Sequence, residues 1–419
     1  MTDLSNDAID VLRTNDRGGF TVPTARLYPF QWNWDSALTA LGFATFDQQR
    51  AWQEIDTLLE GQWPDGMLPH IVFREPDDDY FPGPDVWDTR KSPASSGHSQ
   101  PPVVTSVVLQ LLNKTGRGDK AAELFPALFA YHQWYHNHRD PDATGVVATI
   151  HPWETGRDNC PDWDSGMEAV VIPDDLPAYT RRDTSHVDPA HRPSARQYDQ
   201  FLSIVKFGRE CQWDHQHIYR QGPFLMADPG IQFILLRADR DLLTIARQLG
   251  FEAQQTTIEQ WIERSLQGCD SLWNAQAGGY CARNLKSGEF SDAITNASLL
   301  CFYAAAGNEQ QARQMLAHAT DIAAAVEYTF PSWDPRHPKF ESQRYWRGPV
   351  WAIMNTMIAQ GLAECRHADL ASRVTSDTLQ LIEKTGFCEY FDPLSGAGLG
   401  GDTFTWTAAM YLHLRDNQR

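Results

Sequence analysis

The chain has 419 residues, 42% of them hydrophobic, which is enough for a large buried core. Its 54 acidic residues outnumber 35 basic ones, giving a formal charge of −19 at pH 7. This balance argues against nucleic acid as a partner, because phosphates need a concentrated basic surface. The amino terminus lacks a signal-peptide pattern, and no stretch stays apolar long enough to cross a bilayer, so we expect a soluble protein without a membrane partner.

Seven cysteines are scattered along the chain, and none forms a Cys-x-x-Cys pair with another. An odd number without a regular framework is typical of reduced thiols. We therefore expect a cytoplasmic protein. The sequence leaves a homo-oligomer open.

Apolar residues recur at helical spacing along most of the chain, whereas alternating β-branched runs are rare. The clearest pattern covers residues 228–250, where Asp228 can cap a helix that Pro229 starts and Gly250 ends. The same spacing predicts helices at 47–61, 103–115, 119–138, 253–268, 291–306, 308–326, 349–363 and 367–385. The predicted fold class is therefore all-α.

Long connections between these helices contain the densest aromatic and acidic clusters of the chain. They are residues 61–102, 139–197, 327–348 and 386–404. Loops above about 12–15 residues inside a compact domain usually carry function. We expect a toroid of helical hairpins that displays these loops on one face. Because no linker composition interrupts the chain, we predict a single domain, 1–419, with lid loops at approximately 61–98 and 172–220.

The first cluster places indoles beside hydrogen-bonding side chains. It consists of residues 31–35, Gln-Trp-Asn-Trp-Asp, and residues 61–70, Gly-Gln-Trp-Pro-Asp-Gly-Met-Leu-Pro-His. A pyranose ring needs this combination, because an indole packs on its C–H face while amides and carboxylates bind its hydroxyl groups. Gln100, which precedes the next helix, can point into the same cavity. A Trp-rich turn packed below the barrel is the alternative, since aromatic residues also dominate ordinary cores.

The second cluster, residues 151–164, contains four carboxylates within eleven residues, separated by Trp, Gly and Pro. Such a segment does not form one solvated face of a regular helix and indicates a shaped loop. Apolar walls and neighbouring negative charge raise the pKa of a carboxyl group, so the loop can supply a general acid. A calcium site formed by Asp158, Asp162 and Asp164 is the alternative, although the spacing does not match an EF-hand.

Two further clusters lie nearer the carboxyl end, at residues 343–351 and 387–393. Arg347 in the first is a candidate to hold a catalytic carboxylate ionised or to bind a sugar hydroxyl, and stacking on tryptophan is its structural alternative. Glu389 in the second sits among aromatic residues, where an unpaired carboxylate is costly. Helix capping or pairing with an arginine is the alternative role for Glu389.

Glycoside hydrolysis needs two carboxyl groups on opposite sides of the scissile bond. The loop at 151–164 and the loop around Glu389 are more than 200 residues apart in the sequence, but a closed ring of hairpins brings such loops together. In an inverting enzyme the two groups stand about 6.5–9.5 Å apart, which leaves room for a water molecule.

Taken together, these motifs resemble glycoside hydrolase family 63 over nearly the whole chain. Residues 153–161, Trp-Glu-Thr-Gly-Arg-Asp-Asn-Cys-Pro, are similar to the family signature Trp-Glu-Ser-Gly-x-Asp-Asn-Ser-Pro, in which the Asp before Asn is the general acid. The resemblance therefore implies Asp158 as the general acid. Residues 345–351 with Asn355 match a second family motif, and Glu389 matches the position of the general base.

The Phe-Thr-Trp-Thr sequence at 404–407 also agrees with this family. The resemblance implies an (α/α)6 barrel, inversion of configuration and α-linked glucosyl or mannosyl substrates. It also implies that no metal and no other cofactor takes part in the chemistry.

Short, single-domain members of this family are similar to mannosylglycerate and glucosylglycerate hydrolases. The resemblance thus implies a small α-glycosyl glycerate as substrate, cleaved to hexose and glycerate. Arg192 and Tyr198, with Tyr80 on an earlier loop, occupy places comparable to the lids of such enzymes. We expect Arg192 to bind the glycerate carboxylate, because guanidinium grips a carboxylate in a fork, and a surface arginine is the alternative. The candidate substrate-binding residues are Tyr28, Trp32, Trp34, Asp35, Tyr80, Gln100, Gly156, Arg192, Tyr198, Tyr345, Trp346, Arg347 and Trp351.

Three other functions fit parts of the sequence. A hydrolase with the same catalytic pair could act on a neutral disaccharide or on glucosylglycerol. A sugar epimerase on a helical barrel would use paired histidines, whereas His70, His98 and His151 are single and dispersed along the chain. A non-catalytic carbohydrate-binding protein would keep the tryptophans but would have no reason to keep two carboxylates at the catalytic positions.

Overall fold

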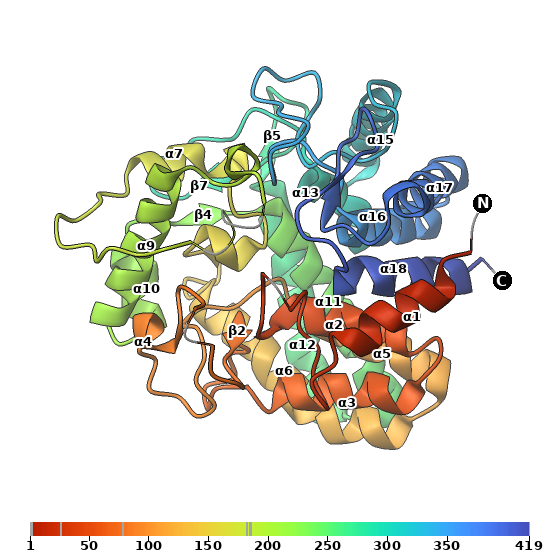
Figure 1. Cartoon of the computed structure of the whole chain (residues 1–419), viewed down its shortest axis with the longest axis horizontal. Helices are drawn as coiled ribbons and strands as arrows, with labels where there is room; N and C mark the ends of the chain where they lie inside the picture. The colour runs from red at the N-terminus through yellow and green to blue at the C-terminus, as the bar shows by residue number, and fades with distance from the viewer. Residues whose placement is uncertain (1–2, 26, 78, 182, 184–186, 419) are drawn as a thin grey trace.

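The computed structural model describes residues 3–25, 27–77, 79–181, 183 and 187–418. Among these residues, a closed ring of inner helices forms the centre of the molecule (Figure 1). In ring order its members are α2 (Asn33–Phe43), α5 (Val104–Thr115), α11 (Pro229–Leu249), the short pair α13 (Asn296–Leu299) and α14 (Cys301–Ala304), α16 (Ala352–Glu364) and α18 (Thr405–Asp416). Each member packs on the next, and α18 packs on α2, so the ring closes.

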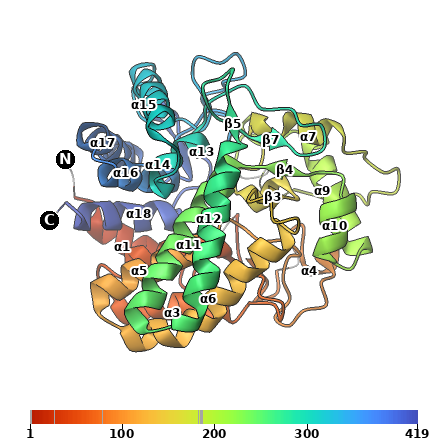
Figure 2. The same cartoon turned by 180° about the vertical axis from the view of Figure 1, so that it is seen from behind.

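A second layer of helices surrounds this ring. Its members are α1 (Ser5–Thr14), α3 (Gln48–Leu59), α6 (Gly118–His138), α12 (Glu252–Asp270), α15 (Glu309–Ala324) and α17 (Ala368–Thr385). Seen from behind, α6 and α12 lie outside α5 and α11 (Figure 2). Because α1 packs on α18, the two ends of the chain lie side by side. The predicted (α/α)6 barrel is confirmed.

The helix predicted at 228–250 forms for the reasons that its sequence indicates. The side chain of Asp228 accepts a hydrogen bond from the backbone N–H of Gly230, and Pro229 occupies the first turn. Gly250 ends the helix with a left-handed φ of 80°. The helix predicted at 291–306 is instead divided, because the N–H of Leu300 bonds to the carbonyl of Ala297 in a tighter turn.

Some helices escape a search for amphipathic periodicity. Every residue of α2 is buried, since this helix packs against the ring on one side and α3 on the other. A helix that is apolar or small on all sides shows no periodic stripe. The same reason applies to α18, which is buried along nearly its whole length.

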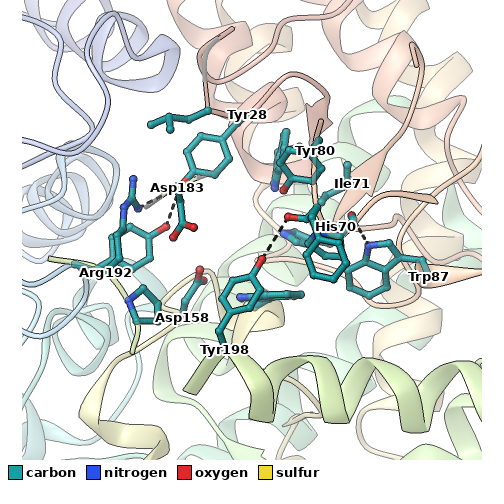
Figure 3. Close-up of a pocket in the computed structure, with 16 residues that line it drawn as sticks. Tyr28, His70, Ile71, Tyr80, Trp87, Asp158, Asp183, Arg192 and Tyr198 are labelled. Carbon is teal, nitrogen blue, oxygen red and sulfur yellow. Dashed lines mark hydrogen bonds between the residues drawn. The ribbon is translucent and has the colours of Figure 1, made fainter. Parts of the chain in front are cut away.

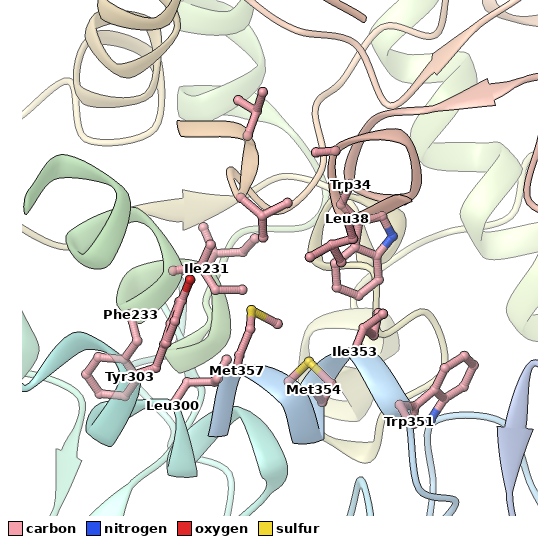
Figure 4. Packing of buried hydrophobic residues seen from close by; sticks show 14 of the residues in the cluster. Trp34, Leu38, Ile231, Phe233, Leu300, Tyr303, Trp351, Ile353, Met354 and Met357 are labelled. Atoms are coloured by element: carbon pink, nitrogen blue, oxygen red, sulfur yellow. The ribbon is translucent and has the colours of Figure 1, made fainter. Parts of the chain in front are cut away.

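The interior of the ring is filled by side chains rather than open. Leu38, Ile231, Leu300 and Met354 come from different inner elements and meet in one cluster (Figure 4). All four are at most 3% exposed. Burial of this kind contributes roughly 1.5–3 kcal/mol for each large aliphatic side chain. The barrel is thus a packed support that positions the loops at its rim.

Strands are short and antiparallel within the described part of the chain. β1 (Gln31–Trp32) pairs with β2 (Ile71–Val72), and β8 (Tyr390–Phe391) pairs with β9 (Gly398–Leu399). β4 (Met226–Ala227) pairs with both β3 (Ala148–Thr149) and β7 (Arg283–Asn284), and β5 (Trp273–Asn274) pairs with β6 (Gly279–Tyr280). These pairings pin the long loops to one another. No helix in the described residues has the length and apolar character needed to span a bilayer.

The two segments predicted as lid loops pack on each other. The first contains α4 (Pro84–Trp87), and the second contains the 3-10 helix η3 (Pro189–His191), α9 (Ala195–Glu210) and α10 (His215–Gln221). The indole N–H of Trp213 donates to the carbonyl oxygen of Trp87 at 2.8 Å. The second predicted lid segment is not a continuous loop, because Ser194 and Gln197 form a capping box that starts α9. A lid role for both segments stays a prediction.

Candidate active site

Two adjoining pockets open at the end of the barrel where the inner helices begin. Many of the residues that line them precede or start α2, α5, α16 and α18, and others come from the loop of Asp158 and from the segments around α4 and α9. The inner pocket has a volume of about 400 Å³ and the outer pocket about 630 Å³. Both are lined by Tyr28, Trp32, His70, Asp158 and Tyr345. Helix amino termini carry a partial positive charge, which favours carboxylates at this end of the barrel.

The loop that carries Asp158 is held rigidly from both sides. Before it, Glu154 is fully buried and pairs with Arg139 at 2.7 Å. Gly156 then adopts a left-handed φ of 70°, and a Cβ atom there would stand 2.6 Å from the Trp34 indole. Directly before it, the guanidinium of Arg157 binds the carboxylate of Asp228 at the start of α11. Directly after it, the side chain of Asn159 accepts a hydrogen bond from the backbone N–H of Trp346 at 2.9 Å. Asp158 is therefore fixed at the boundary of the two pockets.

The three aspartates considered as a calcium site do not converge. Asp162 pairs with Arg157 at 2.9 Å, whereas Asp164 pairs with Lys339 at 3.0 Å. Asp158 lines the pockets instead. In the described part of the chain, no group of three or more His, Cys, Asp or Glu side chains is arranged to hold a metal ion.

The pKa of Asp158 is raised from 3.8 to about 7. Burial is the main cause, because it penalises the charged form, and the carboxylate of Glu389 adds to the shift. The positive charge of Arg192 opposes it. A carboxyl group with this pKa keeps its proton for much of the time at neutral pH, as a general acid must.

Glu389 lies on the inner pocket just before β8 and is 1% exposed. Its Oε1 accepts a hydrogen bond from the Tyr28 hydroxyl at 3.2 Å, and its Oε2 accepts one from the backbone N–H of Gly401 at 3.2 Å. The guanidinium of Arg192 contacts both oxygens, at 3.4 and 2.8 Å. Glu389 thus pairs with an arginine, which was considered above as its alternative role, and it also lines the pocket.

Hydrogen-bonding groups line the base of the inner pocket. Asp35 stands in the first turn of α2, and burial, with smaller contributions from Glu389 and Asp158, raises its pKa well above the ordinary value. Gln100 accepts a hydrogen bond from the backbone N–H of Trp34, which fixes its side chain at the pocket. Asp35 and Gln100 were predicted to bind sugar hydroxyl groups, and both lie at the pocket, as that prediction requires.

Indoles form the wall of the inner pocket. Trp34 and Trp346 line it with their ring centroids 6.3 Å apart, and Trp406 meets Trp34 edge to face. Trp351 lies behind them, fully buried and stacked on Trp346 at 3.7 Å with the rings parallel. Trp351 lines neither pocket and supports Trp346 from behind, so its direct contact with substrate stays a prediction.

Arg347 also differs from its prediction. Its side chain binds Glu341 at 2.9 Å and Asp164 at 3.4 Å, and it lines neither pocket. It also donates to the backbone carbonyl of Asn159, which ties its loop to the loop of Asp158. The arginine that does contact a pocket carboxylate is Arg192.

The three histidines that are dispersed in the sequence form a stack in the structure. The rings of His70 and His98 are 4.8 Å apart and nearly parallel, and His151 continues the stack at 5.0 Å. Burial lowers the pKa of all three, so they are neutral. His70 alone of the three lines the pockets. Dispersion along the chain was therefore a poor guide to their arrangement.

The outer pocket combines aromatic and charged groups from the two packed lid segments. Tyr80, Tyr198 and Arg192, three of the candidate substrate-binding residues, line it together with Asp183 (Figure 3). In this view the carboxyl groups of Asp158 and Asp183 point into the same space. The hydroxyl of Tyr198 donates to the carbonyl oxygen of Phe81 at 3.3 Å, which connects α9 to the first segment.

Several lining residues were not among the predicted ones. Four of them lie within the sequence motifs described above, so those motifs indicated that these positions are near the site: His70, Trp153, Phe404 and Trp406. Asp183 had no such indication, because it lies in an acidic and basic stretch without a motif. The others are Pro23, Leu27, Ile71, Phe81, Pro82, Trp87 and Pro193.

Comparisons with known proteins agree with this geometry. Residues 28–407 match the family model described as the mannosylglycerate hydrolase MGH1-like glycoside hydrolase domain. A mannosylglycerate hydrolase from Thermus thermophilus is 46% identical over 412 residues, which cover 97% of this chain and 99% of the relative. A glucosylglycerate hydrolase from Mycolicibacterium hassiacum is 32% identical over 434 residues, which cover 98% of this chain and 97% of the relative.

A solved structure is similar over the same length. The crystal structure of a family 63 mannosylglycerate hydrolase from Thermus thermophilus, in complex with Tris and D-glycerate, superposes with a TM-score of 0.94. It is 45% identical and covers 98% of this chain and 99% of its own. The family predicted from the sequence motifs is confirmed, and a sugar epimerase and a non-catalytic binding protein are set aside. The chain belongs to glycoside hydrolase family 63, in its mannosylglycerate hydrolase MGH1-like group.

Proposed function

We propose that this chain is an inverting α-glycoside hydrolase that cleaves mannosylglycerate or glucosylglycerate to the hexose and glycerate. The observation that carries the proposal is the position of Asp158 at the boundary of the two pockets, with Glu389 on the inner one. A sugar in the inner pocket and its aglycone in the outer pocket put the scissile bond beside Asp158. The names of the relatives support the substrate class.

In the proposed mechanism, Asp158 gives its proton to the glycosidic oxygen while the bond to the anomeric carbon breaks. Glu389 takes a proton from a water molecule that attacks the opposite face of that carbon, so an α-glycoside yields a β-hexose. Asp35 and Gln100 bind sugar hydroxyls, and Trp346 packs on the ring.

The proposed aglycone site uses Arg192 and the tyrosines of the outer pocket. A carboxylate on the aglycone needs a cation, and Arg192 is the arginine among the described lining residues. Tyr80 and Tyr198 are in position to bind its hydroxyl groups. This assignment favours glycerate over a neutral aglycone of the same size, because a carboxylate accepts charge-assisted hydrogen bonds from a guanidinium and a neutral aglycone does not.

The experiment compares mannosylglycerate, glucosylglycerate, glucosylglycerol, trehalose and kojibiose under one condition, and proton NMR identifies the anomer that is released first. We expect the fastest hydrolysis with one of the two glycerates and initial release of the β-anomer. Initial α-anomer would contradict inversion. Activity on the neutral compounds alone would keep the catalytic pair and overturn the aglycone assignment.

A further inference from the structure

The carboxylate of Glu389 has no free oxygen in the structure. Oε1 accepts from the Tyr28 hydroxyl and lies within reach of one guanidinium nitrogen of Arg192, while Oε2 accepts from the other nitrogen and from the N–H of Gly401. Four donors match the roughly four acceptor sites of a carboxylate. A general base must instead bind the attacking water, so at least one donor has to leave before the reaction.

Arg192 is the donor that can leave. Tyr28 and Gly401 belong to loops at the barrel rim, and the N–H of Gly401 is fixed because its carbonyl also accepts from the N–H of Glu389 at 2.8 Å. Arg192 comes from the segment between η3 and α9, outside the barrel. Its guanidinium lies 4.5 Å above the ring of Tyr345 and donates to the hydroxyl of Tyr28 at 3.2 Å, so its contacts apart from Glu389 are with neutral groups.

Two observations show that Arg192 is prepared for another partner. Its side chain is 1% exposed, yet its Nε has no hydrogen-bond partner among the described residues. It also lines the outer pocket, whereas Glu389 lines the inner one. A buried donor without a partner is costly, and an anion in the outer pocket would satisfy it.

We propose that Arg192 couples the aglycone to the general base: a carboxylate in the outer pocket draws the guanidinium away from Glu389 and frees the oxygen that binds the attacking water. This inference rests on the proposed function and adds to it. An anionic aglycone then raises kcat, and not only the affinity for substrate. A neutral aglycone leaves Glu389 paired with Arg192, so it is bound but hydrolysed slowly.

The same event acts on the general acid. The charge of Arg192 lowers the pKa of Asp158. When an aglycone carboxylate neutralises that charge, this opposition disappears and Asp158 keeps its proton more firmly. When Arg192 exchanges Glu389 for the aglycone carboxylate, it therefore frees the general base and favours the protonated form of the general acid.

The test supplies the sugar and the aglycone carboxylate as two separate molecules. An α-glycosyl fluoride of the hydrolysed sugar fills the inner pocket and leaves the outer pocket empty. Its reaction needs the base only, because water attacks the anomeric carbon, Glu389 accepts the proton and fluoride leaves with the C–F electron pair. Fluoride release is measured with a selective electrode, with D-glycerate or glycerol added at constant ionic strength.

We expect saturating D-glycerate to raise kcat for the fluoride about 5-fold or more, which is the lower end of coupling between two sites. Glycerol, which has no carboxylate, should have no such effect. Arg192→Met should abolish the response to glycerate. Arg373→Met is the matched control, because Arg373 also pairs with a carboxylate, that of Asp377, but on the outer helix α17. It should keep the response.

Inhibition or no change by D-glycerate in the unmodified protein would overturn the inference, and so would equal activation by glycerol. These outcomes do not depend on whether a variant folds. Failure of the proposed function looks different, because neither the glycerate substrates nor the glycosyl fluorides would then be hydrolysed.

Discussion

Replacing Asp158 with Asn tests the general acid most directly. The amide keeps the shape of the side chain but cannot transfer a proton to the leaving oxygen. With a pKa of about 7, Asp158 is about nine-tenths protonated at pH 6 and about one-tenth protonated at pH 8. The alkaline limb of kcat/KM in the unmodified protein should therefore have its midpoint near pH 7.

General acid catalysis contributes roughly 10²–10⁴-fold, so kcat for the glycerate substrate should fall by about that factor in Asp158→Asn. The loss should be much smaller for the α-glycosyl fluoride, because fluoride leaves without a proton. Hexose release measures the first reaction and a fluoride electrode the second, across pH 5–9. The alkaline limb should also vanish in the variant.

Two results would refute this reasoning. Turnover of the glycerate substrate close to that of the unmodified protein would show that Asp158 does not donate the proton. An equal loss on both substrates would show that the variant damages the pocket rather than proton transfer.

The same substitution should stabilise the protein at high pH. Because the pKa is raised in the folded state, ionisation of Asp158 destabilises it, with no effect below pH 4 and the full effect above pH 7. The shift from 3.8 to about 7 corresponds to about 4 kcal/mol, of which we expect about half since the group borders an open pocket. Urea denaturation at pH 5 and pH 8 should show a larger gain at pH 8, and equal gains would contradict the raised pKa.

Three further substitutions separate the roles of the other residues. Glu389→Gln should lower kcat by orders of magnitude and also lower the melting temperature, because Arg192 loses its buried ionic partner. Glu341→Gln, at a partly exposed ion pair, should leave kcat unchanged; comparable kcat values would remove Glu389 as the base. Arg347→Met should cost about 1 kcal/mol in unfolding free energy with little change in KM, and a large rise in KM would restore its predicted contact with substrate. Gly156→Ala should lose about 2 kcal/mol or more and most of its kcat/KM, because the new methyl group would collide with Trp34; normal stability would show that the loop can shift.

The sequence by itself determined the local features of this protein. Apolar spacing and caps predicted amphipathic helices such as α11, because one polar and one buried face leave a periodic trace. It also located most of the loops that carry chemistry, since clusters of Trp, Asp and Gly are unusual in a regular helix, although Trp34 and Asp35 lie in the first turn of α2. Asp158 and Glu389 were found in this way, and the resemblance to a family then assigned their roles.

The tertiary structure decided what each side chain faces. Arg347 follows Tyr345 and Trp346 in a recognised motif and Arg192 does not, yet only Arg192 reaches a pocket carboxylate. Trp351 and Trp346 are neighbours in one motif, yet one lies behind the other. Nothing in the sequence indicates that His70 stacks on His98. Helices without a polar face likewise leave no periodic pattern in the sequence. Closure of the helical ring brings loops together from distant parts of the chain, and no local pattern records which side of a loop then meets the cavity.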